Sequence, residues 1–279
     1  KLTFPRIFLP INTDKFIPKY MQPFTALSVG VSTQNNIGLD KRNLTGILNY
    51  RWNPSPQLSN RLDLLNIQYV RNLNTDNYFN VYRNSYNDLN QIVQSGSIVT
   101  DPAYLNEEGL LTIPTGAESF INDVSNNTGG TTGLDEDQTQ LVNNIGERKN
   151  RLTENNLIFA TNYTYLWNTK KNLYDQEFTR FRFKIETAGN TLSAISSIAD
   201  FEKNENGNYN ILGVNFSQYI KTELDFIKHW DMGQNNILAF RAFGGVAIPY
   251  GNANSIPFVR SFFAGGPNDN RAWRAYDLG

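Results

Sequence analysis

The sequence has no cysteine and only one histidine, and these shortages exclude several kinds of chemistry. Without cysteine there is no disulfide framework and no thiolate metal site. The single histidine, His229, rules out a histidine-rich metal site, and with no serine set beside it a catalytic triad has no support. We therefore expect no catalytic residues, no bound metal and no cofactor.

A strong net charge and long apolar runs are also missing. The 25 basic and 26 acidic residues give a net charge of −1, which does not support binding to nucleic acid. No apolar run approaches the roughly 18 residues that a transmembrane helix needs. The chain begins at Lys1 and carries no signal-like stretch, so we expect a mature chain or a fragment.

Aromatic residues, in contrast, are abundant on otherwise polar segments and make up 13% of the chain. The dominant sequence period is two, which predicts strands with one apolar and one polar face. We expect eight strands, at 1–9, 24–35, 43–53, 61–71, 156–168, 175–188, 212–230 and 236–248.

The segment Phe181–Glu186 separates apolar from charged residues completely, and the strand at 212–230 begins with apolar residues and carries charges on its other face. In a soluble sandwich each would be an ordinary outer strand, whereas in a membrane barrel the apolar face meets lipid and the charged face lines a wet lumen. The recurrence of the pattern, and the length of the strand at 212–230, favour the barrel. The predicted lumen charges are Arg180, Arg182, Lys184, Glu186, Lys221, Glu223 and Asp225. The residues predicted to face lipid are Leu44, Leu48, Phe181, Phe183, Val214 and Phe216.

The connections between the predicted strands tend to alternate in length. Long ones at 72–155 and 189–211 are separated by short ones at 169–174 and 231–235. This is expected when one barrel end has tight turns and the other has long loops, although the connection at 10–23 is longer than this rule favours.

Three of the four tryptophans lie where the predicted strands reach the short turns. Trp52, Trp167 and Trp230 would share one rim of an up-and-down barrel. Because indole is apolar with a single N–H donor, it favours the membrane interface, and we predict that these residues form a membrane girdle.

Residues 72–152 differ from the rest and are interpreted as one extracellular insertion. They are rich in Asn, Gly, Asp and Thr, with a short helix predicted from Asp135 to Arg148. The acidic run that begins at Asp135 lacks the spacing of a calcium-binding EF-hand loop. Acids at the start of a helix explain it better.

The C-terminal stretch carries a family resemblance. It contains Phe262-Phe263-Ala264-Gly265-Gly266, then Arg271-Ala272-Trp273, and closes with Leu278-Gly279. This resembles the sixth extracellular loop of the BamA/TamA superfamily of bacterial outer-membrane assembly barrels, closest to the TamL-like branch of the Bacteroidetes. The family usually has Gly where this chain has Ala272, and Gly265 and Gly266 are candidates for the tight turn.

Earlier pieces of the sequence fit the same branch, so the resemblance spans nearly the whole chain outside the 72–152 insertion. These pieces are Phe4-Pro5-Arg6, Tyr50-Arg51-Trp52, Tyr163-Thr164-Tyr165 and Ala188-Gly189-Asn190.

The resemblance implies an all-β fold, a fragment of a transmembrane antiparallel up-and-down barrel. Residues 1–279 would supply about eight strands, numbers four to eleven of about sixteen, and the following loop. In that family the loop, here 249–279, enters the lumen and its arginine, here Arg271, pairs with acids of late strands beyond this chain. The loop also carries Arg260 and Arg274, which suit a lumen wall supplied with carboxylates. Glu186, Glu223 and Asp225 are the well-placed acids within the chain.

The implied function is assembly, insertion or translocation of proteins in the bacterial outer membrane, without covalent chemistry. The implied partners are outer-membrane lipids and lipopolysaccharide, client β-barrel or surface proteins, and a periplasm-spanning TamB-like protein or lipoprotein accessory subunits.

Three alternatives remain open. The first is a two-partner-secretion-type pore, which shares the loop motif, or a passive porin. The second is a barrel fused to an enzyme domain, although the sequence lacks the Gly-x-Ser-x-Gly elbow of a lipase-like domain. The third is a soluble β-sandwich binding module.

Overall fold

A computed structural model of the chain describes residues 1–36, 39–96, 98–198, 203, 207–211, 213–234 and 236–262. The chain divides into two compact units. The first, which we call the sheet unit, comprises Lys1–Val31, Leu44–Tyr69 and the chain from Asn156 onward. The second, the insertion unit, comprises Ser32–Asn43 and Val70–Asn155.

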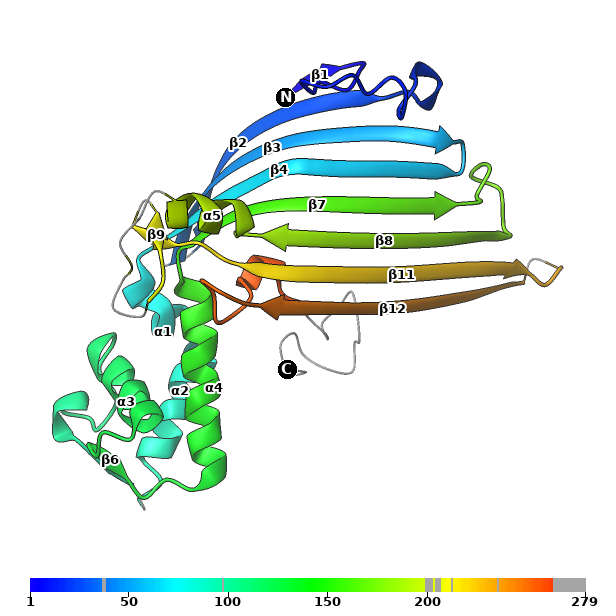
Figure 1. The fold of residues 1–279 in the computed structure, drawn as a ribbon. Coiled ribbons are helices and arrows are strands. Elements are labelled where there is room, and N and C mark those ends of the chain that lie inside the picture. The colour runs from blue at the N-terminus through cyan, green and yellow to red at the C-terminus, as the bar shows by residue number, and fades with distance from the viewer. Residues whose placement is uncertain are drawn as a thin grey trace. The chain divides into compact units, whose positions relative to one another are not determined.

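The main feature is an eight-stranded sheet (Figure 1). Its strands lie side by side in the order in which they follow one another along the chain. The strands, in their spatial order, are β1 (Leu2–Phe4), β2 (Phe24–Asn36), β3 (Leu39–Ser55), β4 (Leu58–Leu73), β7 (Asn156–Asn168), β8 (Phe178–Ala188), β11 (Tyr219–Asp231) and β12 (Ile237–Pro249). The pairs with a described register are antiparallel. The prediction of a mostly β chain with one antiparallel sheet is thus confirmed.

Two predicted strands have different boundaries in the structure. β1 ends at Phe4 rather than at residue 9, because Pro5 has no N–H to donate to the sheet. The prediction of one strand over 212–230 is wrong. Gly213 adopts a left-handed φ of 75°, which breaks the strand, and β11 begins only at Tyr219.

The residues before β11 form a separate small hairpin, in which β10 (Val214–Asn215) pairs with β9 (Asn210–Ile211). The prediction that Val214 and Phe216 face lipid is therefore wrong. Both are buried in a cluster with Leu157, against which Leu192 of the helix α5 (Asn190–Ile198) packs.

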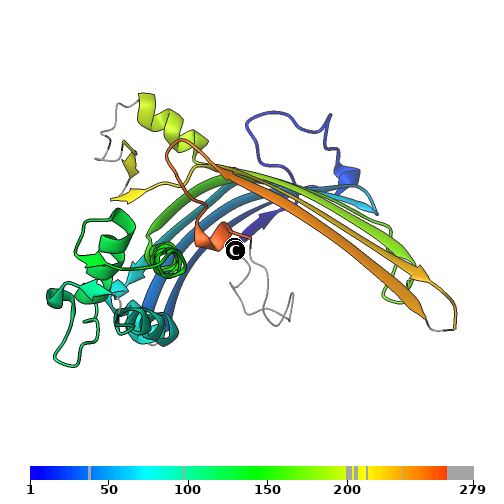
Figure 2. The ribbon, with the colours of Figure 1, turned by 90° about the horizontal axis from the view of Figure 1, so that it is seen from below.

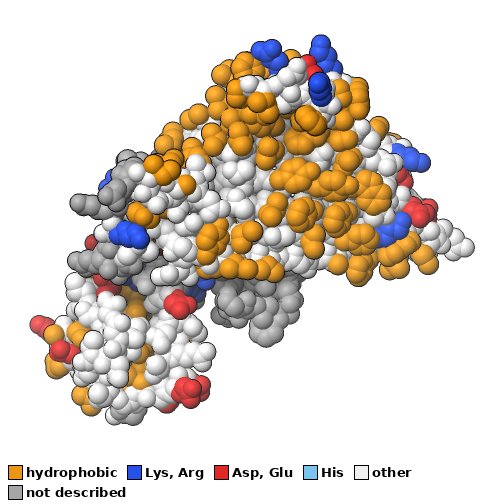
Figure 3. Space-filling view, in the orientation of Figure 1, with side chains coloured by type: hydrophobic (Ala, Val, Ile, Leu, Met, Phe, Trp, Pro, Cys, Tyr) orange, Lys and Arg blue, Asp and Glu red, His pale blue; other side chains and the backbone are white. Residues whose placement is uncertain are grey.

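The pairing register sorts the side chains of the sheet into two faces. On one face, the row across β7, β8, β11 and β12 reads Trp167, Phe181, Phe226, Ala242, and the next reads Tyr165, Phe183, Leu224, Gly244. The sheet is curved and this apolar face is convex (Figure 2). Figure 3 shows apolar side chains gathered across it.

Much of the convex face is exposed. Large apolar side chains remain accessible on the last two strands: Leu224, Phe226, Trp230, Leu238, Phe240, Val246 and Ile248. An exposed apolar surface of this extent is typical of contact sites for proteins or membranes.

The three predicted girdle tryptophans lie near the short-turn ends of β3, β7 and β11, which point the same way in Figure 1. Trp167 and Trp230 are on the convex face by register. The ring of Trp52 lies 6.5 Å from that of Tyr163, which occupies the same face.

The insertion unit is a folded helical body rather than an irregular loop. Its elements are η2 (Thr75–Asn77), α1 (Tyr78–Val81), α2 (Arg83–Val93), β5 (Val99–Thr100), η3 (Pro102–Tyr104), α3 (Thr115–Asn126), β6 (Thr131–Thr132) and α4 (Glu136–Thr153). Its buried apolar residues are Val70, Tyr78, Phe79, Leu89, Ile92, Leu111, Ala117, Phe120, Ile121, Val142, Ile145 and Leu152. Burial raises the pKa of Tyr78 to about 12, so that this phenol stays neutral.

The helix predicted at Asp135–Arg148 is present as α4 and is longer. Asp135 is its N-cap: the Asp135 carboxylate accepts a hydrogen bond from the Gln138 N–H at 2.7 Å, and the Gln138 side chain accepts one from the Asp135 N–H. This capping box accounts for Asp135, and Glu136 and Asp137 lie in the first turn of α4. No helix among the described residues combines the length and apolar character needed to cross a membrane.

We predict that residues 70–155, expressed alone, unfold cooperatively in urea, because the buried apolar residues of the insertion unit all lie within this range. Asn72 also ties the two ends together through hydrogen bonds to Asn155 and to the Glu154 carbonyl. Replacing the fully buried Phe120 by alanine should lower the free energy of unfolding by about 3–5 kcal/mol. The half-exposed Leu141 is the matched control, and Leu141→Ala should cost less than about 0.5 kcal/mol. A gradual transition in the parent fragment would contradict an autonomous core.

Candidate functional site

The concave face of the sheet carries a ladder of opposite charges. Alternation along each strand places Arg182, Lys184 and Glu186 of β8 on one side. The register sets each of them across from a charge of opposite sign on β11: Arg182 faces Asp225, Lys184 faces Glu223, and Glu186 faces Lys221. Directly opposed unlike charges stabilise a strand pair.

Ion pairs form within one row of this ladder, between Arg182 and Asp225, and between neighbouring rows. They link Arg182 to Glu223 (3.6 Å) and Asp225 (3.8 Å), Lys184 to Glu186 (3.2 Å), Lys221 to Glu223 (3.3 Å) and Arg241 of β12 to Asp225 (2.9 Å). Arg180 lies on the same face, in the row that ends at Arg241. All seven charges predicted to line a lumen therefore share the concave face, and six of them are linked in ion pairs.

The chain beyond β12 turns back over this face. Asn252, which is buried, fixes the turn: its side chain accepts a hydrogen bond from the Tyr209 N–H and donates to the carbonyls of Tyr209 and Phe216. The Asn252 N–H in turn donates to the Gln218 side chain at 3.0 Å. The turn is thus held by the segment that precedes β11.

From this turn the chain passes over the concave side of the sheet unit. Ile256 packs against a buried cluster that includes Ala188 and Tyr219. Pro257 then precedes the short helix η4 (Phe258–Arg260). We call residues 250–262 the covering segment (Figure 2).

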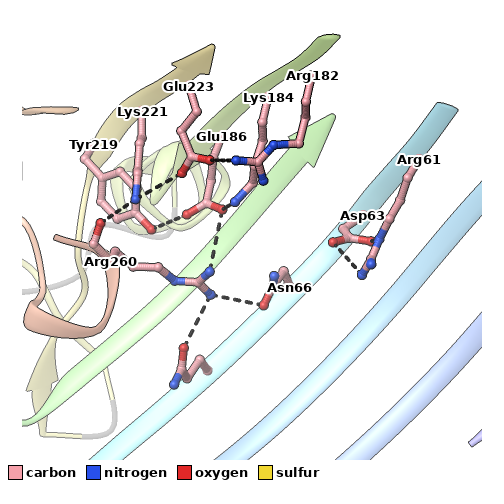
Figure 4. A network of polar contacts seen from close by, with 11 residues as sticks. Arg61, Asp63, Asn66, Arg182, Lys184, Glu186, Tyr219, Lys221, Glu223 and Arg260 are labelled. Carbon is pink, nitrogen blue, oxygen red and sulfur yellow. Dashed lines mark hydrogen bonds and ion pairs between the residues drawn. The ribbon is translucent and has the colours of Figure 1, made fainter. Parts of the chain in front are cut away.

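Arg260 is the charged contact that joins the covering segment to the sheet (Figure 4). One guanidinium nitrogen lies 3.6 Å from the Glu186 carboxylate on β8. The other donates hydrogen bonds of 3.3 Å to the side-chain oxygens of Asn66 and Gln68 on β4. A planar guanidinium carries donors on separate nitrogens in a rigid fork and can contact two strands at once, whereas the three donors of an ammonium share one nitrogen.

Glu186 is only 1% exposed, so its charge needs partners inside the protein. Tyr219 donates a 2.7 Å hydrogen bond to one carboxylate oxygen, while Lys184 and Arg260 lie near the other. Removing a cation from such a site leaves a buried charge undercompensated, which is costly.

Lys221 makes a second connection. Its ammonium donates a 2.7 Å hydrogen bond to the carbonyl of Arg260 and lies 4.0 Å from the ring centre of Phe262. Phe262 also lies over Gly245 of β12, where a Cβ atom would overlap the ring. A glycine in β12 therefore makes room for the covering segment.

The loop motif that carried the family resemblance, Gly265, Gly266, Arg271, Ala272 and Trp273, lies outside the described residues. The sequence indicated that Arg260 suited a wall with carboxylates and that Glu186 was well placed, but it did not pair them. It also gave no role to Tyr219, Asn66 or Asn252. The one hint in the sequence was that Asn66 and Gln68 alternate with apolar residues, which indicates that both side chains lie on the polar face of their strand.

The contacts of the site are ion pairs and hydrogen bonds that position the covering segment. Within the described part of the chain, no group of three or more His, Cys, Asp or Glu side chains is arranged to hold a metal ion. His229 stacks on Phe178 with ring centres 4.4 Å apart at the end of β11. The ladder holds a charged segment against the sheet through Arg260.

We predict that Arg260→Ala loosens the covering segment. The midpoint of thermal unfolding should fall, and the free energy of unfolding should decrease by about 2–3 kcal/mol. The reason is that Glu186 keeps Lys184 but loses its second cation. Chymotrypsin should also cleave faster at Phe258 or Phe262. Arg260→Lys should recover part of the loss, since an ammonium cannot reproduce the fork.

The matched control is Lys228→Ala. Lys228 pairs with Glu177, which is 62% exposed, so its removal should change stability by less than about 1 kcal/mol. Equal losses of stability in Arg260→Ala and Lys228→Ala would show that the buried contact with Glu186 contributes no more to stability than an exposed ion pair.

Comparison of the sequence with known protein families and with curated proteins gives no match. The family resemblance of the C-terminal stretch therefore stays a prediction. The function has to be argued from the two faces of the sheet and from the covering segment.

Proposed function

We propose that this chain is part of an outer-membrane β-barrel that assembles, inserts or translocates other proteins. The observation that carries the proposal is the opposite character of the two faces of one sheet. The convex face is apolar and exposed, and the concave face holds a network of ion pairs. A bilayer outside and water inside match these faces.

The arrangement is the reverse of what a soluble sandwich needs. In a sandwich the apolar face of a sheet packs against a second sheet and the charged face meets solvent. Here the convex face, with half-exposed residues such as Phe240 and Val246, has no second large sheet over it among the described residues. Lipid would satisfy those side chains without any further protein layer.

The covering segment favours an assembly or translocation barrel over a passive porin. Arg260 and Phe262 lie on the concave face, which would be the inner wall of the barrel. A passive channel needs that space open, whereas a gated machine needs a segment that can be held and moved. Arg271 lies shortly beyond the covering segment, and we assign it a second pairing with acids on later strands.

On this proposal the protein resides in the bacterial outer membrane and contacts phospholipid and lipopolysaccharide. Its clients are β-barrel or surface proteins, and a TamB-like protein or lipoprotein subunits act with it. It performs no covalent chemistry and uses no cofactor.

Reconstitution of the full-length protein in liposomes tests the proposal against a porin. An unfolded β-barrel client should acquire heat-modifiable gel mobility faster in liposomes that contain the protein than in empty ones. A small trapped dye should leak no faster than from empty liposomes. Rapid leakage without faster client folding would favour a passive channel.

A variant in cells tests the role given to Arg271. Arg271→Ala should lower client levels in the outer membrane, and the barrel should unfold at a lower temperature in the gel assay. Breaking a well-buried pair should reduce the free energy of unfolding by about 3–5 kcal/mol. Arg271→Lys should rescue partly. Lys170→Ala, in a short turn, is the control. Client levels and barrel stability equal to the parent in Arg271→Ala would refute this role.

A further inference from the structure

The connection between β1 and β2, residues 5–23, is longer than the other links at its end of the sheet (Figure 1). It contains only one short helix, η1 (Lys19–Met21). The neighbouring links, β3–β4, β7–β8 and β11–β12, are tighter. A long connection at the short-turn end calls for an explanation other than joining two strands.

This segment is fastened to the convex face by buried hydroxyl groups. The Thr25 hydroxyl accepts a hydrogen bond from the Phe8 N–H at 2.9 Å and donates one to the Arg6 carbonyl at 2.7 Å. The Tyr50 hydroxyl donates to the Phe8 carbonyl at 2.9 Å. Both hydroxyl-bearing residues are only 2% exposed, and the segment lies on the convex side of the sheet in Figure 2.

While its backbone is held, the segment turns apolar side chains outward. Ile11 is 67% exposed, Phe16 is 81% exposed and Tyr20 is 72% exposed. Hydrogen bonds that fix a backbone while large apolar side chains point away from the protein indicate an apolar environment outside it. The exposed apolar convex face continues from this segment along β2, through Leu27 and Val29.

The same residues carry a clear excess of positive charge. Between residues 1 and 23 there are four basic residues, Lys1, Arg6, Lys15 and Lys19, and the only acid is Asp14. Lysine beside exposed aromatic and aliphatic residues suits a membrane interface, because the stem of lysine lies in the apolar layer and its ammonium reaches the headgroups. Anionic headgroups are the complementary partner for this charge.

We infer that residues 5–23 form an anchor for the lipid leaflet at the short-turn end of the barrel. Ile11 and Phe16 enter the boundary between headgroups and acyl chains, and Lys15 and Lys19 bind anionic phospholipid headgroups. The inference rests on the proposed function, since it requires that the convex face meets lipid. It adds a membrane contact made outside the strands, at the end of the sheet where Trp52 and Trp167 lie.

The 279 residues contain no cysteine, so each introduced cysteine is unique within this part of the protein, and any cysteine elsewhere in the full-length protein is first replaced by serine. Full-length Phe16→Cys, Val246→Cys and Val99→Cys proteins are labelled with a polarity-sensitive fluorophore and reconstituted in vesicles of phosphatidylcholine and phosphatidylglycerol. Nitroxide lipids labelled at the headgroup or in the acyl chain then quench the fluorophore. The label at residue 16 should lie about 5–10 Å below the phosphates and be quenched mainly by the headgroup nitroxide. Val246, on the convex face, should be quenched by the acyl nitroxide, and Val99, in the insertion unit, by neither.

The three labels separate failure of the anchor from failure of the proposed function. Quenching at residue 246 without quenching at residue 16 would overturn the anchor alone and indicate that the segment faces water or a protein partner. No quenching at either residue would overturn the membrane location, and the anchor with it.

A pair of substitutions tests the headgroup contact. Lys15→Gln with Lys19→Gln should reduce quenching of the residue-16 label by headgroup-labelled phosphatidylglycerol roughly two-fold or more, and should have little effect in pure phosphatidylcholine. Lys170→Gln with Lys171→Gln, in the β7–β8 turn, is the matched control and should leave that quenching unchanged. Equal quenching in the two double variants would overturn the assignment of Lys15 and Lys19.

Discussion

The carboxylate of Glu186 has almost no contact with solvent, and the groups around it come from three separate parts of the chain. Lys184 precedes it on the same strand, Tyr219 opens the neighbouring strand, and Arg260 belongs to the covering segment. A buried carboxylate is tolerated only when such partners are present. The position of the covering segment and the charge order of the two strands therefore depend on each other.

The same constraint explains why the two faces of the sheet are so unlike. A side-chain period of two means that any strand with Arg182, Lys184 and Glu186 on one side must present Phe181 and Phe183 on the other. Once the ladder lies on the concave face, the alternate residues of β8, which include Phe181, Phe183 and Ile185, lie on the convex face. The register across β7, β8, β11 and β12 extends this division to four strands. A slip of one residue in β8, β11 or β12 would place charges among the apolar side chains.

The sequence predicted what depends on local alternation and missed what depends on single backbone positions or distant contacts. The strand at 156–168 and the order of all eight strands followed from alternation and link length. The break before β11 did not, since it arises from the left-handed backbone at Gly213, and the apolar pattern of Val214 and Phe216 is the same in a strand and in a packed cluster.

The helices of the insertion were mostly hidden because their core residues are spread thinly among polar ones, and only the capped start of α4 gave a local signal. In the site, the charged face was predicted residue by residue. The pairing of Arg260 with Glu186 joins residues distant in the sequence, and no local pattern encodes such a contact.

The central claim is that one face of the sheet meets lipid and the other meets water. A scan of single cysteines over residues 162–167 of β7 tests it most directly, since this strand lies inside the sheet and the scanned side chains are uncharged. Each spin-labelled protein, reconstituted in a bilayer, is exposed to oxygen and to a water-soluble relaxation agent. We predict that labels at Tyr163, Tyr165 and Trp167 respond to oxygen, and that labels at Asn162, Thr164 and Leu166 respond to the water-soluble agent. A response that does not alternate, or that alternates with the opposite phase, would contradict the account.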